Sequence, residues 1–483
     1  MTSIHTHPDS ELQAQLRARF VGKNLVDVPT PSIVLDLAKV EANCKRMLDA
    51  TDRLGLLWRA HIKSHKTTEL TRLQVGDTLD TPVSLIVSTI TEAENILPLL
   101  KEYQARGRRV NVLFSFPLFP SALPRLNAIS TALGPDPSSY PTLTLMIDHP
   151  AQLAVLSPPS SSSASSPSLG SSLAHPPSIF LKIDTSYGRS GVAPETDACA
   201  ALITAALDAE HRGACHLLGL YSHAGHSYYA RGGTDDVAGY LADELEGLAG
   251  VARWIRKETA VGAGRRFVLS VGATPTASVV QQKLQPKVQK LISRLKEEGL
   301  ELEIHAGVYP TLDMQQLATH ASDVTADDIA ISVVAEVASL YPGRGSDYTT
   351  EVLINAGTLA LGREPVADRG HLPGFDYQGW GFLSPWGLND NNNGGKQQPI
   401  PGRDFPAVHD GWQVGRISQE HGILTWHGRP ENEVPLRYGQ KVRVWPNHSC
   451  IAGAGFDWYL IVDSRNEGKE DEVVDVWPRW RGW

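Results

Sequence analysis

The sequence predicts an α/β fold class, a (β/α)8 TIM-type barrel followed by an antiparallel β domain, and two patterns support the barrel. Short β-type runs rich in Val, Ile and Leu recur eight times, at 56–62, 84–88, 110–116, 142–147, 179–183, 217–221, 267–271 and 301–305. Segments with helical spacing lie between them, at 91–105, 121–133, 194–210, 236–257 and 278–298. Strands that alternate with helices favour parallel pairing, and eight such units fit a closed barrel. On this pattern alone, an open doubly wound sheet is the alternative.

Residues after 320 carry a different pattern, which predicts the second domain. Apolar and polar residues alternate there between Gly and Pro turns, at 329–341, 350–356, 413–418, 422–427 and 440–446. Such alternation with few helical signals is typical of an antiparallel sheet. The segment Ser32–Leu35 precedes the eight strands, and we expect it to pair with this sheet. The expected domains are therefore a barrel over 37–320 and a β domain formed by 1–36 plus 321–483.

Two stretches interrupt these patterns. Residues 157–178 are mostly Ser and Pro, and residues 386–404 are rich in Asn, Gly and Gln. Neither stretch can bury enough apolar surface to offset the entropy lost on ordering. We interpret both as mobile insertions within their domains.

Composition narrows the class of protein. The 483 residues are 41% hydrophobic and 20% charged, which is ordinary for a soluble globular protein. A formal net charge of -9 offers no basic face, so we expect neither nucleic acid nor a membrane as partner. No apolar run approaches the length of a membrane span, and the N-terminus lacks the apolar core of a signal peptide. Four cysteines in so long a chain form no disulfide framework, which favours a reducing, cytoplasmic location.

A lysine follows the first predicted barrel strand. Alternation along this strand places Arg59, His61 and Lys63 on one face, which in a barrel can be the interior. Functional groups of such barrels lie where strands end and loops begin. A buried lysine is costly to desolvate unless it has a task, and one such task is a Schiff base. The alternative is a basic strand end that reaches solvent.

Charged and aromatic residues also follow the fifth and sixth strands. Arg189 lies in the loop after the fifth strand and could hold a phenolate oxygen or a carboxylate, or could stabilise the loop itself. His223 and His226 lie in a glycine-containing loop after the sixth strand. Together they suggest a site, although each histidine alone is more often structural.

The loops after the last two strands favour a phosphate. The seventh strand runs into Gly272 and Thr274, and the eighth into Gly307, Val308 and Tyr309. Small residues and hydroxyls let backbone N–H groups close on a phosphate, and these two loops are the usual phosphate sites of such barrels. A closed barrel makes these loops neighbours of the first strand, which supports the Schiff base at Lys63.

His448 and Cys450 lie two residues apart in the predicted β domain. On an extended chain they share a face, and imidazole with thiolate suits Zn²⁺. Two protein ligands leave positions open for water or substrate, which suits a catalytic metal better than a structural one. Taken alone, a His-x-Cys motif such as this one also occurs often by chance.

Taken as an ordered set, these motifs resemble the eukaryotic, zinc-containing D-serine dehydratases. Their relatives are D-threonine aldolases and alanine racemases, all pyridoxal-phosphate (PLP) enzymes of fold type III. The resemblance covers most of the chain outside the two insertions and is carried by Arg59-x-His61-x-Lys63-x-His65-Lys66, Asp184-Thr185…Arg189-x-Gly191, Gly219-x-Tyr221-x-His223-x-Gly225-His226-Ser227-Tyr228, Gly272-x-Thr274-Pro275-Thr276, Gly307-x-Tyr309, Glu420-His421-Gly422 and Pro446-Asn447-His448-x-Cys450.

The resemblance implies PLP and Zn²⁺ as cofactors. Lys63 would be the catalytic lysine that forms the Schiff base, and His448 and Cys450 would be the metal ligands. The other cofactor-binding residues implied by the motifs are Arg189 at the ring oxygen, with Tyr187, His223, Gly272, Thr274, Gly307, Val308 and Tyr309. The resemblance implies no role for His226, Glu420 or His421.

The implied activity is dehydration of D-serine or a related β-hydroxy D-amino acid to a 2-oxo acid and ammonia, in a homodimer. Lys63 would take the α-proton, and zinc would make the β-hydroxyl a better leaving group. The alternative is D-threonine aldolase cleavage to glycine and an aldehyde, but the metal motif of that type resembles H-x-D, so Cys450 favours the dehydratase. An amino-acid racemase would need a second base, for which there is no clear candidate. A PLP-binding protein without turnover is typically a barrel alone.

Four positions depart from the pattern of these relatives. Ala60 replaces a usual Pro, Ser186 a Gly and Asn355 an Asp. His305 stands where an alanine racemase has the Arg that faces the pyridine nitrogen, so the resemblance assigns no partner to that nitrogen.

Overall fold

The computed structural model describes residues 10–136, 142–156, 173–230, 233–258, 265–366, 377–388, 395–402, 404–405 and 408–483. These residues form two compact units. One consists of Met1–Arg46, Tyr228–Gly233 and Val308–Arg481, and the other of Met47–Ser227, Thr234–Gly307 and Gly482–Trp483. The first predicted insertion lies largely outside the described residues, which omit 157–172, and the second lies partly outside them, because 389–394 and 403 are omitted.

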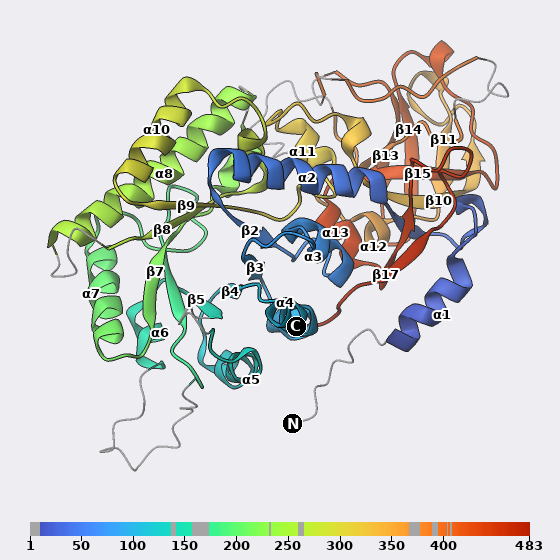
Figure 1. The fold of residues 1–483 in the computed structure, drawn as a ribbon. Coiled ribbons are helices and arrows are strands. Elements are labelled where there is room, and N and C mark those ends of the chain that lie inside the picture. Colours follow the sequence, from blue (N-terminus) through green and yellow to red (C-terminus); the bar gives the residue numbers. More distant parts are fainter. Residues whose placement is uncertain are drawn as a thin grey trace. The chain divides into compact units, whose positions relative to one another are not determined.

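The second unit is a closed barrel of eight parallel strands, which confirms the predicted fold class (Figure 1). Each predicted β-type run became one strand, in the order of the chain. The strands are β2 (Leu57–His61), β3 (Val83–Val87), β4 (Val110–Pro117), β5 (Leu143–Ile147), β6 (Ser178–Lys182), β7 (His216–Tyr221), β8 (Val268–Val271) and β9 (Glu301–Ala306). The pairing of β2 with β9, for example of Trp58 with Ile304, closes the barrel.

Helices follow the strands, and Figure 1 shows several of them beside the barrel. The helices of this unit are α3 (Thr68–Val75), α4 (Ile90–Ala105), α5 (Leu123–Leu133), α6 (Pro150–Ala154), α7 (Asp197–His211), α8 (Thr234–Glu258), α9 (Thr274–Ser278) and α10 (Pro286–Glu297). Threonine hydroxyls cap the starts of α4 and α7. Thr89 Oγ1 accepts the Glu92 N–H at 3.2 Å, and Thr196 Oγ1 accepts the Cys199 N–H at 3.3 Å.

The predicted helix over 278–298 is wrong in its first third. The chain instead forms α9, a short 3₁₀ turn at Val279–Gln281, and then α10 from Pro286. Proline has no N–H to donate to a preceding turn and disfavours the helical conformation in the residue before it. Gln285 accordingly has φ -57° and ψ 142°, and the helix starts only afterwards.

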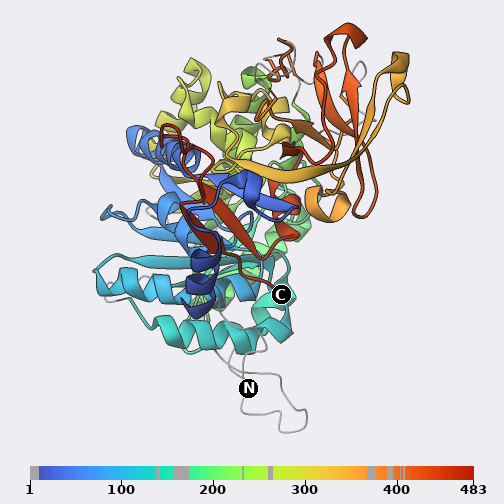
Figure 2. The ribbon, with the colours of Figure 1, turned by 90° about the vertical axis from the view of Figure 1, so that its right-hand side faces the viewer.

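The first unit contains a nine-stranded sheet in the order β11-β14-β13-β12-β15-β10-β1-β16-β17. Figure 2 shows these strands from gold to red, with β1 in blue. They are β1 (Ser32–Asp36), β10 (Ile331–Tyr341), β11 (Glu351–Ile354), β12 (Gly381–Leu383), β13 (Gly411–Ile417), β14 (Gly422–His427), β15 (Lys441–Pro446), β16 (Trp458–Val462) and β17 (Asp475–Pro478). All pairs are antiparallel except that of β1 with β16.

The expected pairing of the N-terminal segment with this sheet is confirmed. Ser32 pairs with Val334 of β10, and Val34 pairs with Leu460 of β16. The sequence patterns missed β12, β16 and β17. Helices α1 (Ser10–Phe20), α11 (Met314–Ala318), α12 (Thr358–Leu361) and α13 (Ser449–Ala454) belong to this unit, while α2 (Leu37–Leu54) leads from it into the barrel unit.

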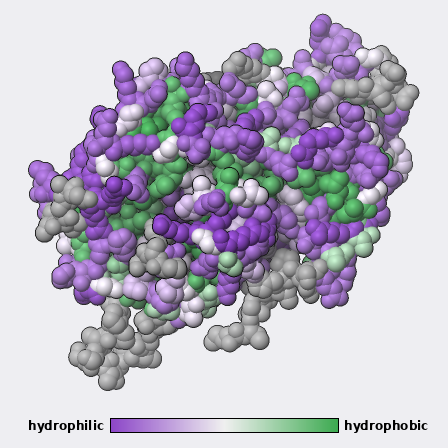
Figure 3. Space-filling model, viewed as in Figure 1, coloured by the Kyte–Doolittle hydropathy of each residue, from purple (hydrophilic) through white to green (hydrophobic). Residues whose placement is uncertain are grey.

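Hydrophilic residues predominate on the face seen in Figure 3, and hydrophobic ones form separate patches between them. Among the described residues, none of the helices combines the length and apolar character needed to cross a bilayer.

Candidate active site

Lys63 and three histidines come together in the barrel unit. His61 ends β2, and its Nδ1 accepts the Lys63 backbone N–H at 3.4 Å. His223 follows β7, and His305 lies in β9. Burial lowers the pKa of all three imidazoles, and the nearby Lys63 charge lowers each of them further. The structure therefore places the predicted Schiff-base lysine among the ends of barrel strands, as expected from the sequence.

The aromatic rings in this region form a stack. The Tyr221 and His305 rings lie 4.3 Å apart between centroids at an angle of 10°, and the His223 ring lies 6.3 Å from His305. His305 Nδ1 is 3.0 Å from Ser270 Oγ, whereas its buried Nε2 has no hydrogen-bond partner among the described residues. A buried polar nitrogen without a partner is costly, and it is satisfied if a polar ligand lies against it.

The histidines of this site are neutral near pH 7. Burial is the main cause of pKa values well below the ordinary 6.5 for His61, His223 and His305. Positive charges add to the effect, and for His223 they are Arg189, Lys63 and Lys182, in decreasing order. Burial, with Arg189 as the next cause, also lowers the pKa of the Lys182 ammonium to about 8. Cationic groups thus converge on a region poor in water.

This electrostatic arrangement fits an anionic cofactor such as PLP. A phosphate monoester and a phenolate oxygen carry the negative charge that Lys63, Lys182 and Arg189 would neutralise. The unpartnered His305 Nε2 is a further polar group for a ligand to satisfy. The residues present therefore fit the group that the sequence predicts.

The loop after β6 carries Arg189 and Tyr187. Asp184 Oδ1 accepts the backbone N–H groups of Tyr187 at 2.9 Å and Gly188 at 3.0 Å, which shapes the turn. Arg189 is exposed, and its guanidinium lies 5.2 Å from the Tyr187 ring centroid. Ser186 has φ 85°, a left-handed conformation that favours glycine. A glycine would adopt this conformation without strain, whereas Ser186 is strained.

Two glycines let the strand ends approach closely. A Cβ on Gly272 would lie 2.1 Å from the His305 carbonyl oxygen, and one on Gly307 would lie 3.1 Å from the His61 carbonyl oxygen. The Gly272 carbonyl lies 2.7 Å from His223 Nδ1. Thr274 begins α9 directly after this loop. The predicted phosphate residues Gly272, Thr274 and Gly307 thus lie at the ends of neighbouring strands.

The other predicted cofactor residues, Val308 and Tyr309, belong to the unit that contains the nine-stranded sheet. Both are buried, and the Tyr309 hydroxyl opposes the rise that burial causes in the pKa of Cys44, in the same unit. His226 lies in the barrel unit, where its ring packs on Tyr240 at 4.6 Å. Glu420 and His421 are exposed in the turn between β13 and β14.

The candidate metal motif lies at the junction of β15 and α13. His448 is extended, with φ -135° and ψ 108°, but Cys450 lies in the first turn of α13. The expectation of a continuous extended segment is therefore wrong, yet the two side chains still meet in a hydrogen bond. Burial lowers the pKa of His448, but Cys450, Asp313 and Glu364 outweigh it and raise that pKa to about 9.

The donor set fits Zn²⁺ with two protein ligands. Imidazole and thiolate are ordinary zinc ligands, and Asp313 fixes the backbone between them by accepting the Ser449 N–H at 2.9 Å. Within the described ranges, no group of three or more His, Cys, Asp or Glu side chains is arranged to hold a metal. A closed structural site of four such ligands is thus not found in that part of the chain.

Sequence reasoning missed two buried charged residues of the barrel unit, Lys182 and Glu244. Lys182 ends β6, and its Nζ lies 4.7 Å from the Tyr221 ring centroid. Glu244 lies on α8 between the buried Leu241 and Leu248. A charged residue at apolar positions of a helix or strand is the signal that could have found both.

Asn355 departs from the relatives for a structural reason. Its Oδ1 accepts the Glu336 N–H at 2.8 Å, while its Nδ2 donates to Thr30 Oγ1 at 2.9 Å. The Nδ2 also donates to the Thr30 carbonyl oxygen at 3.3 Å, a bond that an ionised carboxylate could not make. Nothing in the structure explains Ala60 in place of Pro.

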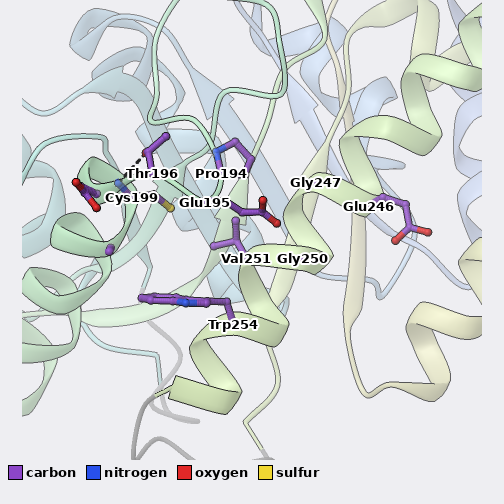
Figure 4. Close-up of a pocket in the computed structure, with 11 residues that line it drawn as sticks. Pro194, Glu195, Thr196, Cys199, Glu246, Gly247, Gly250, Val251 and Trp254 are labelled. Atoms are coloured by element: carbon purple, nitrogen blue, oxygen red, sulfur yellow. Dashed lines mark hydrogen bonds between the residues drawn. The ribbon is translucent and has the colours of Figure 1, made fainter.

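A separate cavity of about 440 Å³ lies between the start of α7 and the middle of α8 (Figure 4). Glu195, Thr196 and Trp254 line it, and Figure 4 shows Glu246 pointing away from the other labelled side chains. None of the predicted site residues lines this cavity.

Comparisons with known proteins agree with the two units. The family model described as "Alanine racemase, N-terminal domain" matches residues 35–282, and "Putative serine dehydratase domain" matches residues 330–462. A D-serine dehydratase of Schizosaccharomyces pombe is 36% identical over 473 residues, which cover 97% of this chain and 95% of that protein. A D-serine dehydratase of Saccharomyces cerevisiae is 28% identical over 477 residues, covering 96% and 99% of the two chains.

A solved structure shows the same fold. D-threo-3-hydroxyaspartate dehydratase from Delftia sp. HT23 superimposes with a TM-score of 0.69 at 24% identity, covering 95% of this chain and 100% of that chain. The full-length similarity to the S. pombe enzyme and the match to the racemase barrel decide the family. The chain therefore belongs to the D-serine dehydratase family of PLP-dependent lyases, which share the barrel of the alanine racemases.

Proposed function

We propose that this protein eliminates water from D-serine or a related β-hydroxy D-amino acid, and that hydrolysis of the product releases ammonia and leaves a 2-oxo acid. The observation that carries the proposal is the cationic barrel site around Lys63, where three histidines are neutral and positive charges converge. Family membership supports the dehydration chemistry and PLP as the cofactor. The preferred amino acid within this class is for the assay to decide.

Each predicted residue has a task in this proposal. Lys63 would hold PLP covalently. Arg189 would bind the ring oxygen, with Tyr187 and His223 beside the cofactor. Bound PLP supplies an electron sink for the α-carbon of the substrate. The phosphate would be held by Gly272, Thr274, Gly307, Val308 and Tyr309.

The side chains of the barrel site would move the proton and exclude water. Lys63 Nζ, once exchanged for the substrate amine, would take the α-proton. His61, His223 and His305 are neutral, so they can orient polar groups through hydrogen bonds without adding positive charge. The buried His61 and His305 rings keep bulk water from the reacting atoms.

His448 and Cys450 would hold Zn²⁺, with Asp313 fixing the backbone between them. The metal supplies a Lewis acid, which makes a β-hydroxyl a better leaving group. By resemblance to its relatives we also propose a homodimer in the cytoplasm, and sedimentation velocity of the purified protein tests the dimer.

The decisive experiment measures the products formed from D-serine. We expect pyruvate and ammonia in equal amounts, no product from L-serine, and loss of turnover on chelation that added Zn²⁺ restores. Glycine and an aldehyde from D-threonine, with no 2-oxo acid from D-serine, would identify an aldolase instead. Full turnover after complete removal of the metal would overturn the zinc assignment alone.

A further inference from the structure

A carboxyl group lies buried in α8, on the face that packs against the barrel. Glu244 is only 1% exposed and continues the apolar stripe of Leu241 and Leu248. A carboxylate removed from water destabilises a protein unless donors surround it. The groups that Glu244 contacts must therefore offset the cost of burying its carboxyl group.

The donors around Glu244 come from two loops. Thr276 Oγ1 lies 3.4 Å from Oε2 and belongs to α9, after β8. The Gly272 and Ala224 N–H groups and the Ser222 hydroxyl also face the carboxyl. Oε1 nevertheless makes no hydrogen bond of standard geometry within the described residues. One carboxyl group thus connects the loop after β7 with the loop after β8.

The same face of α8 contacts a third loop. Gly247 lies one turn after Glu244, and a Cβ there would be 2.8 Å from Thr185 Cγ2. The Thr185 hydroxyl is 2.5 Å from that of Ser222. The loop after β6 carries Arg189, the loop after β7 carries His223, and the loop after β8 leads into Thr274. All three are residues of the proposed cofactor site. The face of α8 at 244–247 is therefore a common support for that site.

We propose that Glu244 is a positioning residue, whose carboxyl group holds the loops after β7 and β8 at the spacing that His223 and the cofactor phosphate require. This inference rests on the proposed function, because it assumes that these loops bind PLP. Glu244 acts through the loops and touches neither cofactor nor substrate.

The charge of Glu244 makes the role testable. Burial raises its pKa to about 7, although the four facing donors oppose this rise. At pH 8 the side chain is mostly a carboxylate that only accepts hydrogen bonds. An amide in its place turns two acceptor positions into donors that face N–H groups. The side chain keeps its size, but only one of its two oxygens remains as an acceptor for the two loops.

The test compares Glu244→Gln with Glu246→Gln, a matched change on the exposed face of α8, where Glu246 pairs with Arg253 and Arg294. PLP is titrated into each apoenzyme at pH 8, and its dissociation constant is measured by fluorescence quenching. We expect Glu244→Gln to weaken PLP binding by about 10-fold to 100-fold, as outer-shell partners typically do. Glu246→Gln should bind PLP as the unmodified protein does.

Thermal unfolding of the same apoenzymes separates positioning from general stability. Glu244→Gln should change the melting temperature little at pH 8, because loss of the buried charge offsets the cost of amide donors that face the loop N–H groups. Glu244→Asp, which keeps the charge one methylene shorter, should recover part of the PLP affinity. A lower melting temperature with an unchanged dissociation constant would overturn the positioning role.

A second variant covers the case in which Glu244→Gln does not fold. Thr276→Val removes the hydroxyl nearest to Oε2 and should also weaken PLP binding, while Ser278→Ala, whose hydroxyl bonds only within its own helix, should not. Equal affinity in Thr276→Val and Ser278→Ala would contradict the inference. If the unmodified protein itself binds no PLP, the proposed function fails first, and the two failures are thus distinguishable.

Discussion

Histidines in the two units of this protein have opposite electrostatic surroundings. In the barrel unit, burial beside cations moves the pKa values of His61, His223 and His305 well below 6.5. In the sheet unit, a thiol and two carboxyls raise the pKa of His448 to about 9 despite burial. The same side chain is therefore a neutral hydrogen-bonding group in one place and a partner of anionic groups in the other.

The comparison shows which of the two predicted cofactors each group of side chains suits. A site rich in cations with neutral imidazoles suits an anionic organic cofactor. A site with thiol and carboxyl groups around an imidazole suits a metal cation. Each variant below alters the residues of one of these two sites and leaves those of the other unchanged.

The largest effect should follow Lys63→Ala. We expect loss of the covalent link to PLP and a fall in turnover by roughly 10²–10⁴-fold, because the α-proton loses its base. Borohydride reduction followed by peptide mapping locates the modified lysine, and steady-state assays measure the loss. Lys66→Ala, three residues on and paired with Glu92 at 2.7 Å, is the control and should keep the link. An adduct on any other lysine would contradict the assignment of Lys63 as the lysine that binds PLP.

Cys450→Ala should affect the other unit. We expect the protein to lose bound zinc and roughly 10²-fold of its turnover, since the Lewis acid contributes several kcal/mol. PLP content, measured by absorbance, should stay the same. Cys199→Ala removes a buried thiol of α7 and should change neither metal nor turnover. Loss of PLP together with zinc in Cys450→Ala would contradict the assignment of Cys450 to the metal alone.

The smallest effect concerns pH and stability. The folded protein keeps the imidazole of His305 neutral, whereas the unfolded chain protonates it below about pH 6.5. The unfolded state then binds more protons, so the free energy of unfolding falls as pH decreases from 7 to 5. His305→Asn should flatten this decrease in the apoenzyme, as measured by urea unfolding. His421→Asn, at an exposed turn, should leave the slope as it was.

Much of the fold could be read from local patterns. All eight barrel strands and five strands of the sheet were predicted, and Ser32–Leu35 was paired with the correct domain. The short β12, β16 and β17 were missed. The helix predicted over 278–298 is too long, because Pro286 cannot continue a preceding helical turn and the helix begins only there. The motif order also led to the correct family, since residue types at strand ends are local information.

The barrel site was predicted only in part for a physical reason. Lys63, His223 and Gly272 stand in recognisable motifs, and the structure brings them to neighbouring strand ends. Lys182 and Glu244 have no motif of their own. Their significance comes from burial by residues that are distant in the sequence.

The sequence by itself determined the alternation of strands and helices, the family, and which residues can carry the chemistry. These properties depend on side-chain period, turn-forming residues and chemical type, all of which can be read along the chain. Only the tertiary structure decided which imidazoles are neutral, that Lys182 has its pKa lowered to about 8, and that Glu244 faces two loops. Desolvation and charge interactions depend on distances through space, and those distances exist only after the chain has folded.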